Sequence, residues 1–141
     1  MVQQNIDKII SNYLSKSIKF SEKNLLATKL SLLDTLGCIY NASTYEDPMR
    51  FATRGKYGSN TNPILIIKDM QSSKEIARYF SILTRWFDYN DTFLAKEWAH
   101  PSDNIGTALG YFIKHREKNL SQFFQSIIQM YEIQGLSLIH I

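Results

Sequence analysis

Residues 21–42, SEKNLLATKLSLLDTLGCIYNA, carry a sustained helical pattern. Ser21 can cap a helix that starts at the next residue, because its hydroxyl can accept a backbone N–H of the first turn. Apolar positions then recur every three or four residues, as on one face of an α-helix; they are Leu25, Leu26, Leu30, Leu33, Leu36, Gly37 and Tyr40. We predict a helix to about Ala42 and interpret it as the central helix of the fold.

Further helical patterns lie on both sides of this stretch. The predicted helices run from Ile6 to Leu14, from near Pro48 to a stop between Gly55 and Gly58, from Ser72 or Ser73 through Phe87, from a Ser102 or Asp103 cap to KHREK (residues 114–118), and from Leu120 to Gly135. Glu75 lies three residues after Ser72, which resembles a capping box. Gly106 and Gly110 lie four residues apart and would let a neighbouring helix approach closely.

One segment favours a strand instead of a helix. PILII, residues 63–67, is a short apolar run between Asn62-Pro63 and Lys68-Asp69. No other strand is evident nearby, and an isolated strand is not stable by itself. We therefore expect its partner to come from elsewhere in a longer chain or from a second subunit.

The composition of the chain is that of one globular unit. Its 141 residues are 44% apolar, enough for one sizeable core and too few for two ordinary domains. The fold class that we predict is mainly α, a partial helical domain with at most one short strand pair. Residues 1–135 form this domain. The final LSLIHI, residues 136–141, is an apolar hexapeptide after the predicted stop at Gly135, and we interpret it as a non-native tail that resembles translated adapter sequence at a truncated reading frame.

The charges and the single cysteine argue against several functions. The net charge of +3 arises from 16 basic and 13 acidic residues that are scattered along the chain, so no basic run indicates a nucleic-acid or lipid partner. Cys38 alone cannot form a disulfide framework or a thiolate cluster. No apolar stretch approaches the roughly 18 residues of a membrane span. We expect an intracellular, cytoplasmic protein without a membrane or nucleic-acid partner.

The segment RWFDYNDTFLAKEWAHPSDN, residues 85–104, gathers carboxylates, an imidazole and two tryptophans in one irregular stretch. Asp88, Asn90 and Asp91 can be explained as a helix end with Asx turns, the ordinary role of such residues in loops. A calcium loop is excluded, because Phe93 occupies the required glycine position and Ala99 the position of the distal glutamate. A metal site is an alternative interpretation and would need His100, Asp103 and an upstream aspartate.

The more specific interpretation of this segment is an acid–base site. The unperturbed pKa of histidine lies near neutrality, and a carboxylate within hydrogen-bond reach would orient the ring and favour its charged form. Asp88, Asp91 and His100 could form such a group, with the aromatic residues excluding water and Pro101 fixing the exit of the loop. Spacing alone leaves this interpretation and the structural one both open.

Two motifs in this segment resemble one enzyme family. The order D-x-N-D-T at residues 88–92 and E-W-x-H-P-S-D-N at residues 97–104 is similar to the MmgE/PrpD family, and specifically to its 2-methylcitrate dehydratase branch. LLDTLGCIYNAS, residues 32–43, resembles a helix signature of the same family. The resemblance extends from about residue 5 to 135. It implies a mostly helical domain, in a protein roughly three times longer, with a second α/β domain and further catalytic histidine and lysine residues downstream.

The resemblance also implies a reaction and its residues. Family members of this branch remove water from 2-methylcitrate to give 2-methyl-cis-aconitate, without an iron–sulfur cluster. The implied catalytic residues are His100 and Asp88, and the implied substrate-binding residues are Thr92, Asp91, Lys96 and Asn104, with Asp91 more important for holding the loop. We expect no metal and no cofactor, a small tricarboxylate as substrate, and a homodimeric full-length parent.

The chain itself need not perform this reaction. We predict that these 141 residues are inactive and prone to associate, because half of the pocket would be missing and apolar helix faces would be exposed. The alternative function is a small helical interaction module without catalysis. The two differ in whether Asp88, Thr92 and His100 share a cleft or point apart into solvent.

Overall fold

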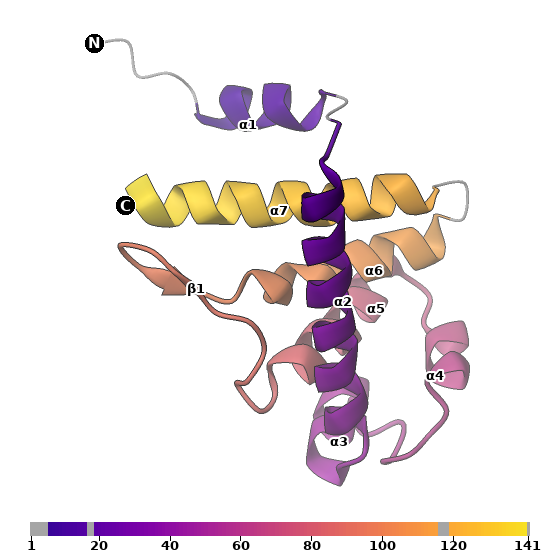
Figure 1. Ribbon diagram of the computed structural model, residues 1–141. Coiled ribbons are helices and arrows are strands. Elements are labelled where there is room, and N and C mark those ends of the chain that lie inside the picture. The colour runs from indigo at the N-terminus through magenta and orange to yellow at the C-terminus, as the bar shows by residue number, and fades with distance from the viewer. Residues whose placement is uncertain (1–5, 17–18, 116–118, 141) are drawn as a thin grey trace.

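The computed structural model describes residues 6–16, 19–115 and 119–140. Its elements are α1 (Ile6–Leu14), α2 (Glu22–Ser43), α3 (Glu46–Thr53), α4 (Pro63–Asp69), α5 (Ser73–Arg85), β1 (Phe93–Leu94), β2 (Trp98–Ala99), the 3-10 helix η1 (Pro101–Asn104), α6 (Ile105–Lys114) and α7 (Leu120–His140) (Figure 1). The two strands form an antiparallel hairpin. The expected mainly α fold with one short strand pair is thus confirmed. None of the described helices has the length and apolarity that crossing a bilayer requires.

Capping residues start the helices at the predicted places. The Ser21 hydroxyl accepts a hydrogen bond from Asn24 N at the start of α2, 3.2 Å away. Ser72 and Glu75 form a capping box at the start of α5. The Ser72 hydroxyl accepts a hydrogen bond from the backbone N–H of Glu75, and the Glu75 carboxylate accepts one from the backbone N–H of Ser72. Pro48 lies in the first turn of α3, where its missing N–H costs no helical bond. These starts follow from local hydrogen bonding, which explains why the sequence predicts them.

The main core surrounds α5. Ile76, Tyr79 and Leu83 on this helix are fully buried and pack with Met49 of α3 and Ile66 of α4. A second apolar cluster joins α6 to α7 and contains Ile105, Ala108, Phe123 and Ile127. Helix α5 therefore connects the N-terminal helices to the C-terminal pair, and the loop that leaves its end starts from a fixed point.

Two glycines allow α6 to lie directly against α5, as the sequence predicts. A Cβ atom at Gly106 would lie 2.7 Å from the backbone N of Ser81, and one at Gly110 would lie 2.5 Å from the backbone O of Ser73. Real Cβ atoms essentially never approach other atoms so closely. Only glycine at both positions permits this spacing of the two helices.

Adding a methyl group at Gly106 should therefore destabilise the fold. Gly106→Ala forces α5 and α6 apart, and we expect it to lower the free energy of unfolding by about 2 kcal/mol in urea denaturation. Gly37→Ala is the matched control, because a Cβ at Gly37 meets nothing within 4 Å. In dilute protein that control should raise stability by up to about 1 kcal/mol through helix propensity. Equal effects of the two substitutions would contradict the packing argument.

The expected strand at residues 63–67 is wrong, because this segment forms α4. Asn62 Oδ1 accepts from Ile64 N at 2.9 Å, and Pro63 occupies the first turn. Ile66 points into the core while Ile64 and Leu65 are exposed. A five-residue apolar run cannot distinguish a strand from one helical turn, and the Asn-Pro pair was the neglected start signal. Because this segment is a helix, the expected strand partner from a longer chain or a second subunit is also wrong.

Three predicted helix boundaries are also wrong. Helix α5 ends at Arg85 instead of Phe87. The cap predicted at Ser102 or Asp103 is absent, because residues 101–104 form η1 and α6 begins only at Ile105. Helix α7 continues through Gly135 to His140. A Cβ at Gly135 would lie 3.4 Å from the Phe93 ring, so this glycine makes room for the hairpin and does not stop the helix.

The predicted end of α6 near Lys114 is confirmed, while residues 116–118 of KHREK lie outside the described residues. The non-native origin of residues 136–141 stays a prediction.

Helix α2 forms as predicted, but it is not the central helix of the fold. One side of it packs on the protein and the other side is exposed. Its buried residues are mostly small or polar, and they are Thr28, Thr35, Cys38, Ile39, Ala42 and Ser43. Leu32 is partly buried and packs against the second apolar cluster. Leu26, Leu30, Leu33, Leu36 and Tyr40 are 42–74% exposed. Periodicity identified the helix and could not show which side of it is buried.

The Tyr79 hydroxyl is buried in the core and has no hydrogen-bond partner among the described residues. Burial raises the pKa of Tyr79 to about 12, whereas tyrosine in an unfolded chain ionises near about 10. Between these values the unfolded state loses its proton first, so stability falls as the pH rises. Tyr79→Phe should raise the free energy of unfolding at neutral pH by about 1 kcal/mol and flatten this alkaline loss. Tyr40→Phe, at a 74% exposed side chain, should change neither quantity in denaturant titrations.

Candidate active site

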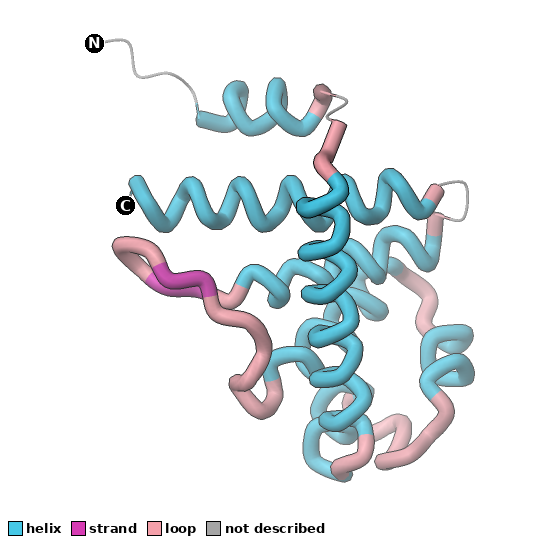
Figure 2. The backbone as a smooth tube through the Cα atoms, viewed as in Figure 1, coloured by secondary structure: helices cyan, strands magenta, loops and turns pink. Residues whose placement is uncertain are grey.

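A hairpin brings the two predicted motifs together. The chain leaves α5 after Arg85, runs out through β1 and returns through β2 to η1 (Figure 2). Phe93 pairs with Ala99 and Leu94 with Trp98. Residues 88–92 precede the hairpin and His100 follows it, so both lie at its open end. This pairing makes neighbours of groups that are about ten residues apart in sequence.

His100 is held by one ring nitrogen and buried at the other. Nδ1 donates to the backbone oxygen of Asp91 at 2.6 Å, and a carbonyl can only accept, so Nδ1 carries a proton. In the neutral ring Nε2 then has the free lone pair. Nε2 is buried, lies 3.6 Å from Asp88 Oδ1, and makes no hydrogen bond with any described residue. The Trp98 ring meets the imidazole edge-on, with 5.4 Å between centroids.

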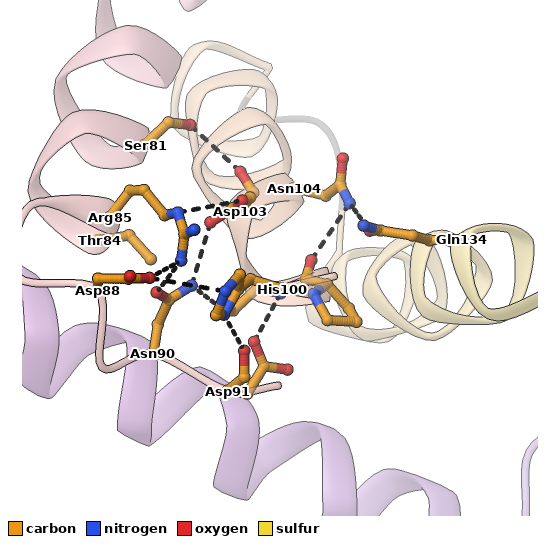
Figure 3. Close-up of polar contacts among 12 residues, drawn as sticks. Ser81, Thr84, Arg85, Asp88, Asn90, Asp91, His100, Asp103, Asn104 and Gln134 are labelled. Carbon is orange, nitrogen blue, oxygen red and sulfur yellow. Dashed lines mark hydrogen bonds and ion pairs between the residues drawn. The ribbon is translucent and has the colours of Figure 1, made fainter. Parts of the chain in front are cut away.

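Asp88 connects His100 to an arginine. Its backbone has a φ of 57°, in the left-handed region that a short polar side chain tolerates, and its N–H donates to Arg85 O. This turn directs the carboxylate back toward α5, where Oδ1 lies 2.5 Å from an Arg85 guanidinium nitrogen. The Asp88 side chain is 68% exposed. One carboxylate oxygen therefore faces a permanent cation on one side and Nε2 of His100 on the other (Figure 3).

The buried side-chain amide of Asn90 holds the loop around Asp88 in place. Asn90 is 3% exposed, and its Nδ2 donates to Ser102 Oγ at 2.7 Å and to Asp103 Oδ1 at 3.0 Å. Arg85 donates to Asn90 Oδ1 at 3.3 Å, and its Nε lies 3.9 Å from Asp103 Oδ2. These bonds join the end of α5, the loop and η1 (Figure 3). They fix the position of the backbone on both sides of Asp88.

Asp91 contributes to the site as a structural link. Its Oδ1 accepts from the backbone N of Ser102 at 3.0 Å, while its backbone oxygen accepts from His100. Both bonds tie the loop before the hairpin to the segment after it. The geometry agrees with the loop-holding role that the sequence favours for this residue.

The other predicted residues are placed less centrally. Thr92 is exposed and follows Asp91 directly. Lys96 is exposed at the tip of the hairpin, roughly 13 Å along an extended strand from His100. Asn104 donates to Pro101 O at 3.2 Å and to Gln134 Oε1 at 2.6 Å, which joins η1 to α7. The structure brings Asp88, Asp91 and His100 together, whereas Lys96 lies at the tip of the hairpin and the Asn104 amide binds Pro101 and Gln134.

Two residues of this network have roles that sequence reasoning missed. Arg85 was taken only as the start of the segment, and Asn90 only as a turn residue. The three-residue spacing of Arg85 and Asp88 at a helix end could have indicated an ion pair. Nothing in the sequence shows that Asn90 is buried, because its partners Ser102 and Asp103 are more than ten residues away.

The arrangement does not favour the metal interpretation. Among the described residues, no group of three or more histidine, cysteine, aspartate or glutamate side chains is placed to hold a metal ion. The carboxylate of Asp103 binds Asn90 and approaches Arg85, and His100 faces Asp88. The set His100, Asp103 and an upstream aspartate is thus engaged in hydrogen bonds and ion pairs.

The formal charge of the cluster is negative. Asp88, Asp91 and Asp103 supply three carboxylates and Arg85 one guanidinium, which gives −2 when His100 is neutral. A cluster with this balance repels a multiply charged anion unless further cations join it.

Comparison with known proteins places these motifs in a family. The model of the MmgE/PrpD N-terminal domain matches residues 9–138. This chain belongs to the MmgE/PrpD family. The motifs around Asp88 and His100 therefore lie inside the matched domain, as the resemblance implied.

Several curated relatives of this chain are named 2-methylcitrate dehydratase. A probable 2-methylcitrate dehydratase of Saccharomyces cerevisiae is 31% identical over 94% of this chain and 29% of its own length. The 2-methylcitrate dehydratase of Escherichia coli K12 is 32% identical over 74% of this chain and 24% of its own. A relative from Yarrowia lipolytica, named as mitochondrial, is 26% identical over 93% and 28%. The chain thus spans less than a third of these relatives' lengths. No solved structure gives a significant match.

Proposed function

We propose that this chain provides the acid–base part of a 2-methylcitrate dehydratase active site. The observation that carries the proposal is the convergence of Asp88 and His100, 3.6 Å apart at the open end of the hairpin. It occurs in a domain whose curated relatives are named 2-methylcitrate dehydratases. The substrate in this proposal is a small tricarboxylate and the product is 2-methyl-cis-aconitate.

The elimination requires a base and an acid. A C–H proton next to a carboxylate passes to the base, the carbon–carbon double bond forms, and the hydroxyl group takes a proton and leaves as water. Nε2 of His100 suits the base, because Nδ1 already holds a proton and donates it to Asp91. When Nε2 becomes protonated, the nearby Asp88 carboxylate stabilises the imidazolium.

Access to Nε2 depends on the side chains that cover it. Nε2 is buried, Trp98 lies edge-on against the ring, and the Asp88 side chain is largely exposed. Opening Nε2 to a substrate would require the exposed Asp88 side chain to rotate outward and leave its ion pair with Arg85. Thr92 is exposed and follows Asp91 directly, and in this proposal its hydroxyl hydrogen-bonds to a substrate oxygen. In the same proposal Lys96 and Asn104 are weaker substrate contacts.

The isolated chain should not catalyse the reaction. The described cluster has a formal charge of −2, while a tricarboxylate needs cations to neutralise its own charges. The longer relatives have room for such groups in the more than two thirds of their length that this chain does not span. Incubation of the purified chain with 2-methylcitrate should give no unsaturated product by liquid chromatography. Turnover by the chain alone would contradict this part of the proposal.

A domain exchange tests the function itself. Residues 9–138 of this chain would replace the matching segment of the Saccharomyces relative, and the chimera would be assayed for dehydration of 2-methylcitrate. We expect turnover by the chimera and none by a version that lacks the domain. A folded chimera with bound substrate and no turnover would contradict the assignment. The homodimeric state and cytoplasmic location of a longer parent belong to the same proposal.

A further inference from the structure

One oxygen of Asp88 lies close to two functional groups of the candidate site. Asp88 Oδ1 is 2.5 Å from Nη1 of Arg85 and 3.6 Å from Nε2 of His100. Figure 3 shows both contacts meeting at this carboxylate. The structure therefore contains a position where a carboxylate is paired with a guanidinium and lies near the nitrogen that suits the base. In this structure the chain's own Asp88 fills that position.

A substrate that reaches Nε2 of His100 has to displace Asp88. Nε2 is buried, whereas the Asp88 side chain next to it is 68% exposed. Displacement separates this carboxylate from Arg85, and an ion pair so exposed to solvent is weak enough for another carboxylate to compete with it. A substrate carboxylate that takes the vacated place restores the lost ion pair. The exchange leaves the guanidinium paired.

Arg85 is held in position by residues other than Asp88. Its Nη1 donates a hydrogen bond to Oδ1 of the buried Asn90 at 3.3 Å, and its Nε lies 3.9 Å from Asp103 Oδ2. The Arg85 side chain is 37% exposed, so a ligand can reach the guanidinium. Because these two partners remain when Asp88 moves, the guanidinium is already in place before a substrate arrives.

We propose that Arg85 binds the substrate carboxylate next to the C–H bond that is broken, at the position that Asp88 Oδ1 fills in this structure. This assignment rests on the proposed dehydration of 2-methylcitrate. The product carries its methyl group on the new double bond, so the proton leaves the methyl-bearing carbon, which also bears a carboxylate. That carboxylate and its carbon then lie between Arg85 and Nε2 of His100.

This placement puts a positive charge where negative charge develops. As the proton passes to Nε2, the electron pair of the C–H bond spreads onto the neighbouring carboxylate, which gains negative charge. A guanidinium can stabilise this carboxylate with two parallel N–H donors. The electron pair then forms the carbon–carbon double bond, while the hydroxyl group takes a proton and leaves as water. Asp88, displaced but nearby, still favours the imidazolium through its charge.

The cation that the sequence suggests, Lys96, is less suited to this role. Lys96 is exposed at the tip of the hairpin, roughly 13 Å along an extended strand from His100. Its ammonium group is also a point charge without the planar fork of a guanidinium. Among the described residues of the cluster around Asp88, Arg85 supplies the permanent positive charge. It serves one substrate carboxylate, so the other two still need cations from outside this chain.

Kinetics of the chimera test the assignment. Arg85→Ala should keep the circular dichroism spectrum and lower kcat/KM for 2-methylcitrate on the order of 10²-fold, as expected when a donor to a developing negative charge is removed. Arg50→Ala is the matched control, because Arg50 forms an ion pair of the same i,i+3 spacing with Asp47 on α3. This control should leave kcat/KM unchanged. An unchanged kcat/KM in Arg85→Ala would overturn the assignment.

Chemical rescue separates substrate binding from a structural role of Arg85. Guanidinium chloride, at concentrations too low to unfold the protein, should restore part of the turnover of Arg85→Ala, because the small cation can occupy the vacated place. Urea at the same concentration has a similar shape without the charge and should restore none. Equal effects of the two additives would overturn the assignment. If Arg85→Ala does not fold, Arg85→Gln replaces it in the kinetic and binding comparisons, because its amide can still donate to Asn90.

Binding of an unreactive ligand tests Arg85 without turnover. The ligand is the substrate without its hydroxyl group, compared with the same molecule carrying an amide in place of the carboxylate on the methyl-bearing carbon. By calorimetry the amide should bind the unmodified chimera about 10-fold more weakly, whereas Arg85→Ala should bind both ligands equally. The same loss in both proteins would overturn the assignment. Absence of turnover in the unmodified chimera would instead contradict the proposed function, on which this binding comparison does not depend.

Discussion

His100→Ala in the chimera described above is expected to lower the turnover number for 2-methylcitrate by about 10²–10⁴-fold. The imidazole supplies the basic Nε2 atom, and no other described group near Asp88 offers a neutral nitrogen base. The fold should survive, because the His100 ring contacts the loop and Trp98 and lies outside the two apolar clusters. Steady-state kinetics and circular dichroism measure the two effects separately.

Two further variants separate catalysis from loop structure. Asp88→Asn keeps the size of the side chain but removes its charge, so it should reduce turnover less than His100→Ala while the loop geometry is kept. His115→Ala changes a histidine at the far end of α6, roughly 15 Å from its start, and should leave turnover unchanged. If His100→Ala retained the turnover of the unmodified chimera, His100 would have no part in the mechanism.

Asn90→Ala should lower the free energy of unfolding by about 3 kcal/mol. The asparagine side chain is almost fully buried and bonds to Ser102, Asp103 and Arg85 at once. Its loss leaves a buried hydroxyl and parts of a carboxylate and a guanidinium without their partners, and each unsatisfied group adds to the cost. Urea denaturation followed by tryptophan fluorescence measures the change, since both tryptophans lie in this segment.

The matched control for Asn90 is Asn12→Ala on α1. Asn12 is exposed, and a substitution at such a surface position usually changes stability by less than about 0.5 kcal/mol. A loss at Asn90 no larger than the loss at Asn12 would show that the network in Figure 3 does not hold the loop. A large loss with unchanged backbone elsewhere would assign the rigidity of the site to this one amide.

Local capping signals explain why much of the fold could be predicted. Ser21, the Ser72 and Glu75 pair, and Pro48 each act within one helical turn, so the sequence contains both the group and its partner. PILII contained a comparable signal in Asn62-Pro63, but its apolar run favoured the wrong element. Gly135 was wrongly interpreted as a helix stop. The glycine is needed there because the Phe93 ring, far away in the sequence, packs against this position.

The candidate site divides in the same way. The motif residues Asp88, Asp91 and His100 could be selected from the sequence, because they resemble a family pattern and carry the required chemistry. Arg85 and Asn90 could not, since their roles depend on Ser102 and Asp103 across the hairpin. Asn104 was selected for its type, but the fold uses its amide to bind Gln134 of α7.

The sequence by itself determined most of the helices, the family and the candidate site residues of this protein, because capping, periodicity and motif order act between residues close in the chain. Only the tertiary structure decided which face of α2 is covered, where α7 passes Gly135, and how the hairpin places His100 beside Asp88. Those outcomes depend on contacts between distant segments. Each such contact selects one of several arrangements that the local pattern allows equally.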